Sequence, residues 1–470
     1  MALLLPDRPE LIFSYLGAMK VGAVPIPLNV DQSAAEIGHC LRDSRAKAVV
    51  VAEEYLAKVE AVRSDQPLLR HVVAVPGATR AGGRGDRPVA PTDAAGGGVV
   101  LDYQSLVAES CDELGAAATS RDDMAFWMYS SGTTGPPKAV VHLHQDLLFY
   151  LPPFCEEVLD IREDDVILST SKPFFSYGRN ATLETPLLYG ASAVLLTARP
   201  RPEPVLEAIA RYRPTLLFSV PSFYGALLEH VRQCGRAGDL ASLRVCVSSG
   251  EALPAALFEG WRETCGLEII EVLGSTDAGA MYLANMPGQV KAGSAGRLLP
   301  GFEARLVDHE GREVPPGGIG TLHLKSRGAT PFYWHRRELS RRTILGEWLD
   351  TGDRFYQDAE GFYWYVGRGD ELFKFRGMWV VPLEIENLLV THPAVLECAV
   401  LGGPGEDGLL RPRAVVVLRP RCVPSAELSR EMEEFVGRSL APYKVPRAWE
   451  FVEELPRTAT GKVRRFLLRG

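Results

Sequence analysis

Apolar and polar residues alternate along much of this chain in blocks that predict helices and buried strands in turn. Residues 10–19 and 33–42 carry apolar side chains at helical spacing, whereas residues 23–28 and 48–52 are short apolar runs typical of strands. Strands that alternate with helices indicate sheets with helical crossovers, so the expected fold class is α/β. Residues 1–7 fit the tail of a strand that runs into a loop. The alternation resumes through the strand-like runs 166–169, 193–196, 215–218 and 245–247.

The pattern changes in the last third of the chain. Between about residues 296 and 324, short β runs separated by Gly- and Pro-containing turns predict a small β-rich subdomain. Further on, residues 382–391 predict a helix and residues 397–401 a strand. We therefore expect a large N-terminal domain of α/β subdomains plus the β-rich subdomain, residues 1–369. A small, mobile α+β C-terminal domain, residues 370–470, follows it.

Composition narrows the classes of function. The 470 residues include 51 Lys and Arg against 59 Asp and Glu, so the net charge is −8 and no basic footprint for nucleic acid is present. No apolar run reaches the ~18 residues of a membrane-spanning helix, so membrane insertion is not expected. The eight cysteines are scattered without a Cys-x-x-Cys pair. Dispersed thiols of this kind are typical of a protein in the reducing cytoplasm. Residues 77–98 are rich in Gly, Arg, Pro and Ala, which predicts a surface excursion, that is, a long surface loop.

The densest chemistry lies in residues 129–138, between two apolar runs that predict a strand on either side. Five hydroxyl side chains, two glycines and Lys138 fall within these ten residues. Glycines let backbone N–H groups approach a ligand, hydroxyls add donors and the lysine adds positive charge, which together suit a polyphosphate. The segment is not a Walker A loop, because Lys138 follows two prolines. A Ser- and Gly-rich surface turn remains the alternative.

Four weaker segments also carry chemistry. Residues 271–277 end in a hydroxyl beside a carboxylate, which can hold a phosphate with its magnesium, or Ser275 or Thr276 caps a following helix. Asp353 follows a predicted tight turn and could accept from sugar hydroxyls, or belong to an ordinary turn. Residues 367–371 fit a hinge around Arg368 or a solvated turn. Residues 456–465 form a second Gly/Thr/Lys loop, or a basic tail.

Taken together and in this order, these segments resemble the acyl-adenylate-forming superfamily of acyl- and aryl-CoA ligases, luciferases and nonribosomal adenylation domains. The resemblance covers nearly the whole chain, and residues 130–138, 349–353 and 456–462 carry it. Within the superfamily the chain is most similar to the benzoate-CoA ligase branch, on residues 123–132, 174–178, 247–254 and 374–380.

The resemblance implies ATP-dependent activation of an aromatic carboxylic acid to aryl-AMP, followed by transfer to CoA. ATP, Mg²⁺ and CoA are the implied cofactors and co-substrates, in a monomer or a homodimer. One alternative is a stand-alone enzyme that loads the phosphopantetheine thiol of a carrier protein. Another is a catalytically idle homologue that binds nucleotides or acyl-adenylates as a regulator.

The resemblance also implies roles for individual residues. Lys462, Thr276 and Asp277 would be catalytic, with Asp277 also the magnesium ligand, and Asp370 would be the hinge about which the small domain rotates. The phosphates and the nucleoside would contact Ser130, Ser131, Gly132, Thr133, Thr134, Gly135, Lys138, Gly250, Glu251, Ala252, Glu271, Val272, Leu273, Asp353 and Arg368. The aryl acid would lie among Phe175, Tyr177, Gly178, Gly274, Gly279 and Ala280, and the thiol would approach Gly377, Met378 and Trp379.

The chain departs from the family pattern at a few positions. Asp277 stands where the family usually has glutamate, so magnesium is expected to be held through a water or more weakly. Gly279 and Ala280 are small, which indicates a larger or ring-substituted aromatic acid. Asp370 and Glu371 replace the usual paired aspartates. Members of the family usually have a substantial N-terminal stretch before the segment that matches residues 3–6, and this sequence lacks it. Three interpretations are open: the start of the sequence is misassigned, the sequence is a fragment, or the enzyme is weakened.

Overall fold

The computed structural model describes residues 1–77, 99–130, 137–369, 372–375, 378–404, 410–420, 422–457 and 463–468. Nearly all of the predicted surface excursion at residues 77–98 lies outside this part of the chain. Within the described residues, no helix combines the length and the apolar character needed to cross a membrane.

The start of the chain builds a parallel sheet with the strand order β2-β1-β3-β4-β5. The predicted helices at 10–19 and 33–42 are confirmed as α1 and α2, and Ser33 begins α2 with a capping box to Glu36. The predicted strand at 23–28 shortens to β2. The elements are β1 (Ala2–Leu4), α1 (Pro9–Lys20), β2 (Ile26–Pro27), α2 (Ala34–Asp43), β3 (Ala48–Ala52), α3 (Leu56–Arg63), β4 (His71–Val75), β5 (Val100–Asp102) and α4 (Tyr103–Glu109).

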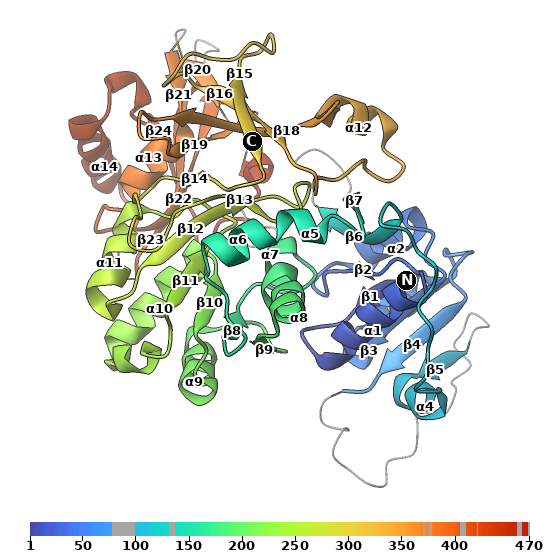
Figure 1. Cartoon of the computed structure of the whole chain (residues 1–470). Coiled ribbons are helices and arrows are strands. Elements are labelled where there is room, and N and C mark those ends of the chain that lie inside the picture. The colour runs from blue at the N-terminus through green and yellow to red at the C-terminus, as the bar shows by residue number, and fades with distance from the viewer. Residues whose placement is uncertain are drawn as a thin grey trace.

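A second sheet follows with the strand order β14-β13-β12-β11-β10-β8-β9, parallel from β9 to β12 and antiparallel beyond. The predicted strands in this region are confirmed, and α9, α10 and α11 cover one face of the sheet (Figure 1). The elements are β8 (Val166–Ser169), β9 (Ser192–Val194), α9 (Pro202–Tyr212), β10 (Leu216–Ser219), α10 (Pro221–Cys234), β11 (Val245–Ser248), α11 (Ala255–Cys265), β12 (Ile269–Gly274), β13 (Met281–Ala284) and β14 (Arg297–Leu298).

The two sheets share one hydrophobic core. Because successive strand residues face opposite sides, Leu216 and Phe218 join a core with Leu3 and Val50 of the first sheet, whereas Leu217 packs under α9, α10 and α11. A hairpin and short helices add further residues to this core, among them Phe126, Tyr150 and Phe154. The elements are β6 (Met124–Ser130), β7 (Lys138–Leu143), α5 (Leu147–Tyr150), α6 (Pro152–Glu157), α7 (Ser176–Arg179) and α8 (Thr185–Tyr189). Strands β6 and β7 confirm the predicted strand on either side of the hydroxyl-rich loop.

The predicted β-rich subdomain is confirmed, but the turn predicted before Asp353 is wrong. Asp353 lies inside the long strand β18, where Gly352 kinks the chain at φ +71° without ending the ladder. Arg368 ends the neighbouring strand β19, where it pairs with Asp353. Of the segment 367–371, predicted as a hinge or a turn, Asp370 and Glu371 lie outside the described residues. The elements are β15 (Glu303–Val307), β16 (Gly320–Lys325), α12 (Arg337–Thr343), β17 (Ile344–Leu345), β18 (Trp348–Gln357) and β19 (Tyr363–Arg368).

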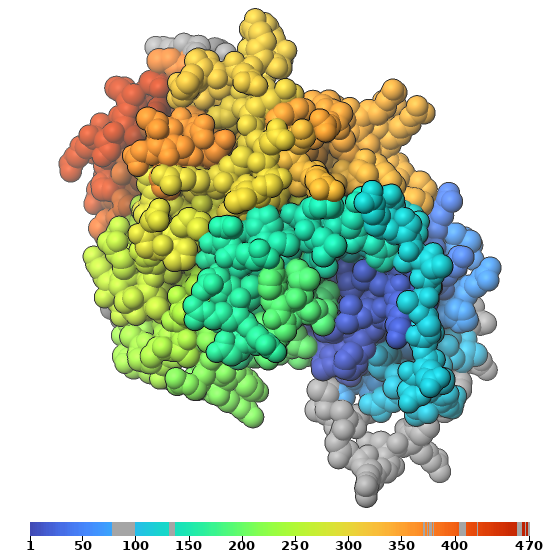
Figure 2. Space-filling view, viewed as in Figure 1, coloured from blue at the N-terminus to red at the C-terminus, as the bar shows by residue number. Residues whose placement is uncertain are grey.

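A small C-terminal domain has its own core, which includes Ile385, Val400 and Val416. It packs beside the β-rich subdomain, where α13 contacts β19 (Figures 1 and 2). The predicted helix at 382–391 and strand at 397–401 are confirmed as α13 and β22. The elements are β20 (Phe373–Phe375), β21 (Met378–Val380), α13 (Pro382–Leu389), β22 (Val395–Pro404), β23 (Leu410–Leu418), α14 (Ala426–Ser439) and β24 (Ala448–Phe451).

Candidate active site

The hairpin β6–β7 holds the two ends of the hydroxyl-rich loop together. Ser130, the last residue of β6, lies opposite Lys138, the first residue of β7, in an antiparallel ladder. Ser131, Gly132, Thr133, Thr134 and Gly135 lie outside the described residues. The described stem therefore fixes where the loop leaves and re-enters the sheet, and it places Lys138 at the point of re-entry.

Lys138 reaches from this hairpin to the turn between β12 and β13. Its Nζ lies 2.9 Å from Oδ1 of Asp277, and the two side chains are 21% and 20% exposed. The same Nζ lies 3.7 Å from the centre of the buried Tyr333 ring, a cation–π contact. A cation and a carboxylate that both keep access to solvent are suited to an anionic ligand and its counter-ion.

Thr276 sits beside Asp277 in this turn. Its Oγ1 accepts a hydrogen bond from Ser176 Oγ at 3.1 Å, and its carbonyl oxygen lies 2.8 Å from His142 Nε2. No helix follows: the chain turns and enters β13 at Met281, so the alternative of a helix cap is wrong. Ser275 Oγ instead accepts from the Ala278 N–H inside the turn, at 3.1 Å.

Two more predicted residues lie near the same turn. Arg368 Nη1 lies 3.5 Å from Asp353 Oδ1 across the β18–β19 ladder. Burial, with a smaller contribution from the Asp353 and Asp277 carboxylates, holds the pKa of the Tyr282 phenol well above its usual range. Both carboxylates therefore lie within electrostatic reach of one phenol. Asp277, predicted for the magnesium, and Asp353, predicted for the ribose, thus lie near the same tyrosine.

The residues predicted to line the adenine slot come from two adjacent parallel strands, β11 and β12, and from the loop after β11. Gly250, Glu251 and Ala252 come after β11, and Glu271, Val272 and Leu273 lie in β12. Glu271 is buried, and its Oε1 accepts from the Leu253 N–H at 3.1 Å. Burial raises the pKa of Glu271 to about 8. Carboxyl ends of parallel strands are a common place for nucleotides.

The predicted aryl-acid pocket contains glycines that close packing requires. An added Cβ would lie 2.2 Å from the Tyr150 ring at Gly279, 2.2 Å from Lys172 O at Gly178 and 2.5 Å from Ala280 O at Gly274. Tyr177 donates its hydroxyl to the carbonyls of Ser219 and Val247, at the ends of β10 and β11. The remaining members are Phe175, half-buried before α7, and Ala280, which is buried.

A buried polar network that the sequence did not suggest contacts the predicted pocket residue Gly279. Glu184 accepts from the Tyr150 hydroxyl at 2.9 Å and from Asn180 Nδ2 at 2.5 Å. Arg179 Nε lies 2.9 Å from the same carboxylate, and Arg179 Nη2 lies 3.5 Å from the carbonyl oxygen of Gly279. Nothing local distinguishes these residues, because their partners come from three separate segments.

The C-terminal domain touches the predicted adenine slot through Arg457. Its Nη1 lies 3.5 Å from Glu251 Oε1, and its Nη2 contacts Glu397 within the small domain. Arg457 also pairs with Val463 through a backbone bridge. Lys462 lies between these two residues in the sequence but outside the described residues. Asp370 and Gly377 also lie outside the described residues. Met378 and Trp379 lie in β21, and Met378 is exposed.

Asp277 offers one carboxylate toward a metal, and within the described residues no cluster of three or more His, Cys, Asp or Glu side chains gathers to hold one. Magnesium often binds through one or two protein carboxylates together with substrate phosphates and waters. The donor set therefore fits a magnesium ion that is bound together with a nucleotide.

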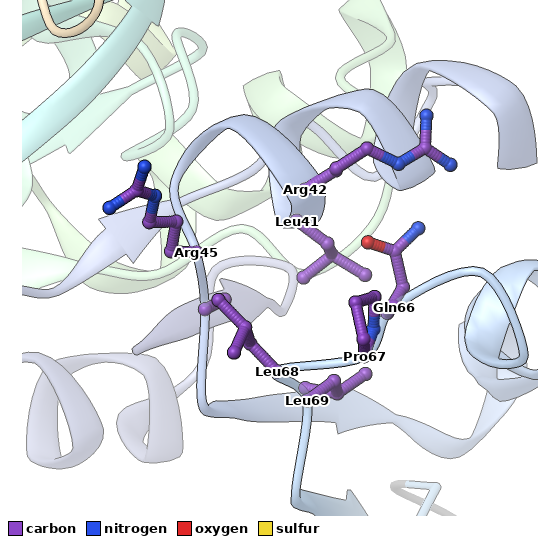
Figure 3. Close-up of a pocket in the computed structure, with 8 residues that line it drawn as sticks. Leu41, Arg42, Arg45, Gln66, Pro67, Leu68 and Leu69 are labelled. Carbon is purple, nitrogen blue, oxygen red and sulfur yellow. The ribbon is translucent and has the colours of Figure 1, made fainter.

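A small pocket elsewhere is separate from this site. It lies beside the C-terminal end of α2, is lined by residues that include Leu41, Arg42, Arg45, Gln66 and Leu69, and has a volume of about 40 Å³ (Figure 3). That volume suits a few water molecules rather than an organic substrate. None of the predicted site residues lines it.

Comparison with known proteins places this geometry in a family. The sequence pattern of the AMP-binding enzyme family matches residues 1–334, and that of the AMP-binding enzyme C-terminal domain matches residues 384–462. The chain is 38% identical to a benzoate–CoA ligase from Thauera aromatica, over 97% of this chain and 82% of that protein.

Solved structures agree with the sequence comparison. The chain is similar to an anthranilate CoA ligase in complex with anthranoyl-AMP, with a TM-score of 0.90 and 38% identity, over 99% of this chain and 86% of that one. It is also similar to a benzoate CoA ligase from Burkholderia xenovorans, with a TM-score of 0.88 and 35% identity, over 100% and 89% of the two chains. The chain therefore belongs to the family of AMP-binding enzymes.

Proposed function

We propose that this protein is an AMP-forming acid–thiol ligase that converts an aromatic carboxylic acid, ATP and CoA into aryl-CoA, AMP and pyrophosphate. The observation that carries the proposal is the convergence of Lys138, Thr276 and Asp277 at one turn, in a chain similar to benzoate and anthranilate ligases. A lysine, a threonine hydroxyl and an aspartate together suit the phosphates of ATP.

In the first step the carboxylate of the acid attacks the α-phosphorus of ATP, and pyrophosphate leaves with the electron pair of the broken P–O bond. Lys138 and the hydroxyls of the loop from Ser130 to Thr134 would hold the β- and γ-phosphates. Thr276 would donate to the α-phosphate, and Lys462 would approach both the carboxylate and the α-phosphate. Preorganised donors of this kind stabilise the charge that builds in the transition state.

Asp277 would hold the magnesium ion, which neutralises phosphate charge when it is bound with ATP. Glu251, Glu271 and their neighbours would line the adenine, and Asp353 with Arg368 would bind the ribose hydroxyls. The small Ala280 would leave room for the ring, whereas the space beside Gly279 is filled by Tyr150 and does not contribute to that room. Tyr177 is held by hydrogen bonds to carbonyl oxygens of β10 and β11.

In the second step the thiol attacks the carbonyl carbon of aryl-AMP, and AMP leaves with the bridging oxygen. We place the boundary between the two domains at the predicted hinge Asp370, about which the small domain would rotate. Gly377, Met378 and Trp379 would then face the thiol. A cytoplasmic location and a monomeric or homodimeric state remain predictions.

Mass spectrometry of the products tests the proposal. The purified chain would be incubated with ATP, magnesium, CoA and a panel of benzoates that carry hydroxyl, amino or larger ring substituents. We expect aryl-CoA and an equal amount of AMP for at least one acid. Aryl-AMP without aryl-CoA would indicate that the acceptor in the second step is a carrier-protein thiol and not CoA. The absence of both products would contradict the proposal.

A further inference from the structure

His142 is a buried side chain whose contacts point to the candidate site. It lies in β7, four residues after Lys138, and is 0% exposed. Its Nε2 lies 2.8 Å from the carbonyl oxygen of Thr276. Because a carbonyl oxygen only accepts, Nε2 carries the hydrogen of this bond.

The other side of the ring is fixed by Asp146. Nδ1 of His142 lies within hydrogen-bond distance of Asp146 Oδ2, at 3.1 Å, and the same oxygen accepts from the Leu143 N–H at 2.9 Å. The ring also stacks on Phe126, with 5.0 Å between ring centres and 22° between planes. The imidazole is therefore held at both nitrogens and on one face, which fixes the direction of its bond to Thr276.

Strand β7 thus contacts the turn at two points. Residues four apart in a strand face the same side, so Lys138 and His142 point together toward the turn. Lys138 binds the side chain of Asp277, and His142 binds the carbonyl of the peptide that joins Thr276 to Asp277.

Thr330 supports the turn from a third direction. Its N–H donates to the Asp277 carbonyl oxygen at 2.7 Å, and its hydroxyl donates to the Val141 carbonyl oxygen, also at 2.7 Å. The carbonyls on both sides of Asp277 are therefore attached to β7, one directly through His142 and the other through Thr330.

We propose that His142 is a positioning residue for the adenylation step: its Nε2–H fixes the Thr276–Asp277 peptide and so aims the Thr276 hydroxyl and the Asp277 carboxylate at the phosphates of ATP. Asp146 holds the ring in the orientation that this bond needs. The inference rests on the proposed function, because the groups that His142 positions are those assigned to ATP. A displacement of ~1 Å at such groups can cost ~10²-fold in rate.

Two substitutions separate positioning from simple filling of the core. In His142→Gln the side-chain amide can still donate to the Thr276 carbonyl, whereas His142→Leu fills similar space without a donor. His392→Leu is the matched control, because His392 is a buried histidine of the C-terminal domain. For each variant, kcat and KM for pyrophosphate release would be measured alongside the melting temperature, with an acid that the wild type activates.

We expect His142→Leu to lower kcat by ~10–100-fold with KM for the acid nearly unchanged, His142→Gln to recover most of that loss, and His392→Leu to keep the wild-type kcat. Equal kcat in the Leu and Gln variants, or a loss confined to the melting temperature, would overturn the inference.

Crystal structures of the two variants test the same point without any substrate. We expect the contact between Lys138 Nζ and Asp277 Oδ1 to persist in His142→Gln and to be lost or lengthened in His142→Leu. An unchanged turn in the Leu variant would overturn the positioning role even if the wild type activated no acid. Failure of the wild type to release pyrophosphate with any acid would instead count against the proposed function.

Discussion

Lys138 and Asp277 form an ion pair with 2.9 Å between Nζ and Oδ1, although 139 residues separate them in the sequence. The pair joins the hairpin that carries the hydroxyl-rich loop to the turn that follows β12. The pair keeps partial access to solvent, and screening by that solvent limits what it contributes to folding stability. We therefore expect the pair to matter chiefly for the ligand.

Replacement of Lys138 tests this expectation. Lys138→Met should lower the rate of aryl-AMP formation by ~10²–10³-fold, because one positive charge near the phosphates is lost. The rate would be measured as pyrophosphate release, with the exposed Lys47→Met as the control variant. Similar rates in the two variants would remove Lys138 from the phosphate site.

Lys462→Ala should separate the two half-reactions. Aryl-AMP formation should fall by ~10²–10³-fold, since Lys462 is the proposed donor to the charge that builds at the α-phosphate. Thioester formation from supplied aryl-AMP should change little. Both rates would be followed by mass spectrometry of AMP and aryl-CoA, and an equal loss in both half-reactions would refute the assigned role.

Enlarging Ala280 should narrow the range of acids. Ala280 is buried next to Gly279, so in Ala280→Leu the larger side chain should exclude ring substituents more than it excludes benzoate itself. The ratio of kcat/KM between a substituted benzoate and benzoate should fall by ~10–100-fold. Ala284→Leu, at a buried alanine that ends β13, controls for general overpacking. An unchanged ratio would place Ala280 outside the pocket.

The raised pKa of Glu271 predicts that the stability of the folded protein depends on pH. Burial raises the pKa of Glu271 to about 8 from its ordinary value of 4.5, so the folded state keeps the carboxyl protonated where the unfolded chain has lost the proton. Stability from this group is complete below about pH 4.5 and is lost progressively as the pH rises to about 8.

Glu271→Gln removes this titration. The melting temperature of the variant, relative to that of the wild type, should therefore rise between pH 5 and pH 8. Glu263→Gln, on the exposed side of α11, should show no such trend. A difference between Glu271→Gln and the wild type that stays flat with pH would contradict the protonated state assigned to Glu271.

Local sequence patterns predicted strands well where a run of residues is continuously apolar. They failed where a β-strand continues through polar residues and glycine. Residues 48–52 are a continuous apolar run, and β3 has those bounds. Asp353 was assigned to a turn because Gly352 and its polar neighbours resemble one. Pairing with β16 and β19 keeps that segment in a strand, and such pairing is a tertiary effect that a local pattern does not contain.

The candidate site shows the same division. The family resemblance assigned Lys138 to the phosphates and Asp277 to the magnesium ion. Their direct contact, however, depends on packing between segments that are distant in the sequence. His142 went unnoticed because a histidine within an apolar strand has no distinctive local pattern. Its position on the same face of β7 as Lys138 is the one signal in the sequence that could have drawn attention to it.

Transfer of oxygen from the acid to AMP tests the central claim most directly. The chain would convert an aromatic acid labelled with ¹⁸O at both carboxylate oxygens, with ATP, magnesium and CoA, and the products would be weighed by mass spectrometry. Attack of the carboxylate on the α-phosphorus predicts one ¹⁸O in AMP and one in the aryl-CoA carbonyl. AMP without label, or ADP in place of AMP, would contradict the route through aryl-AMP.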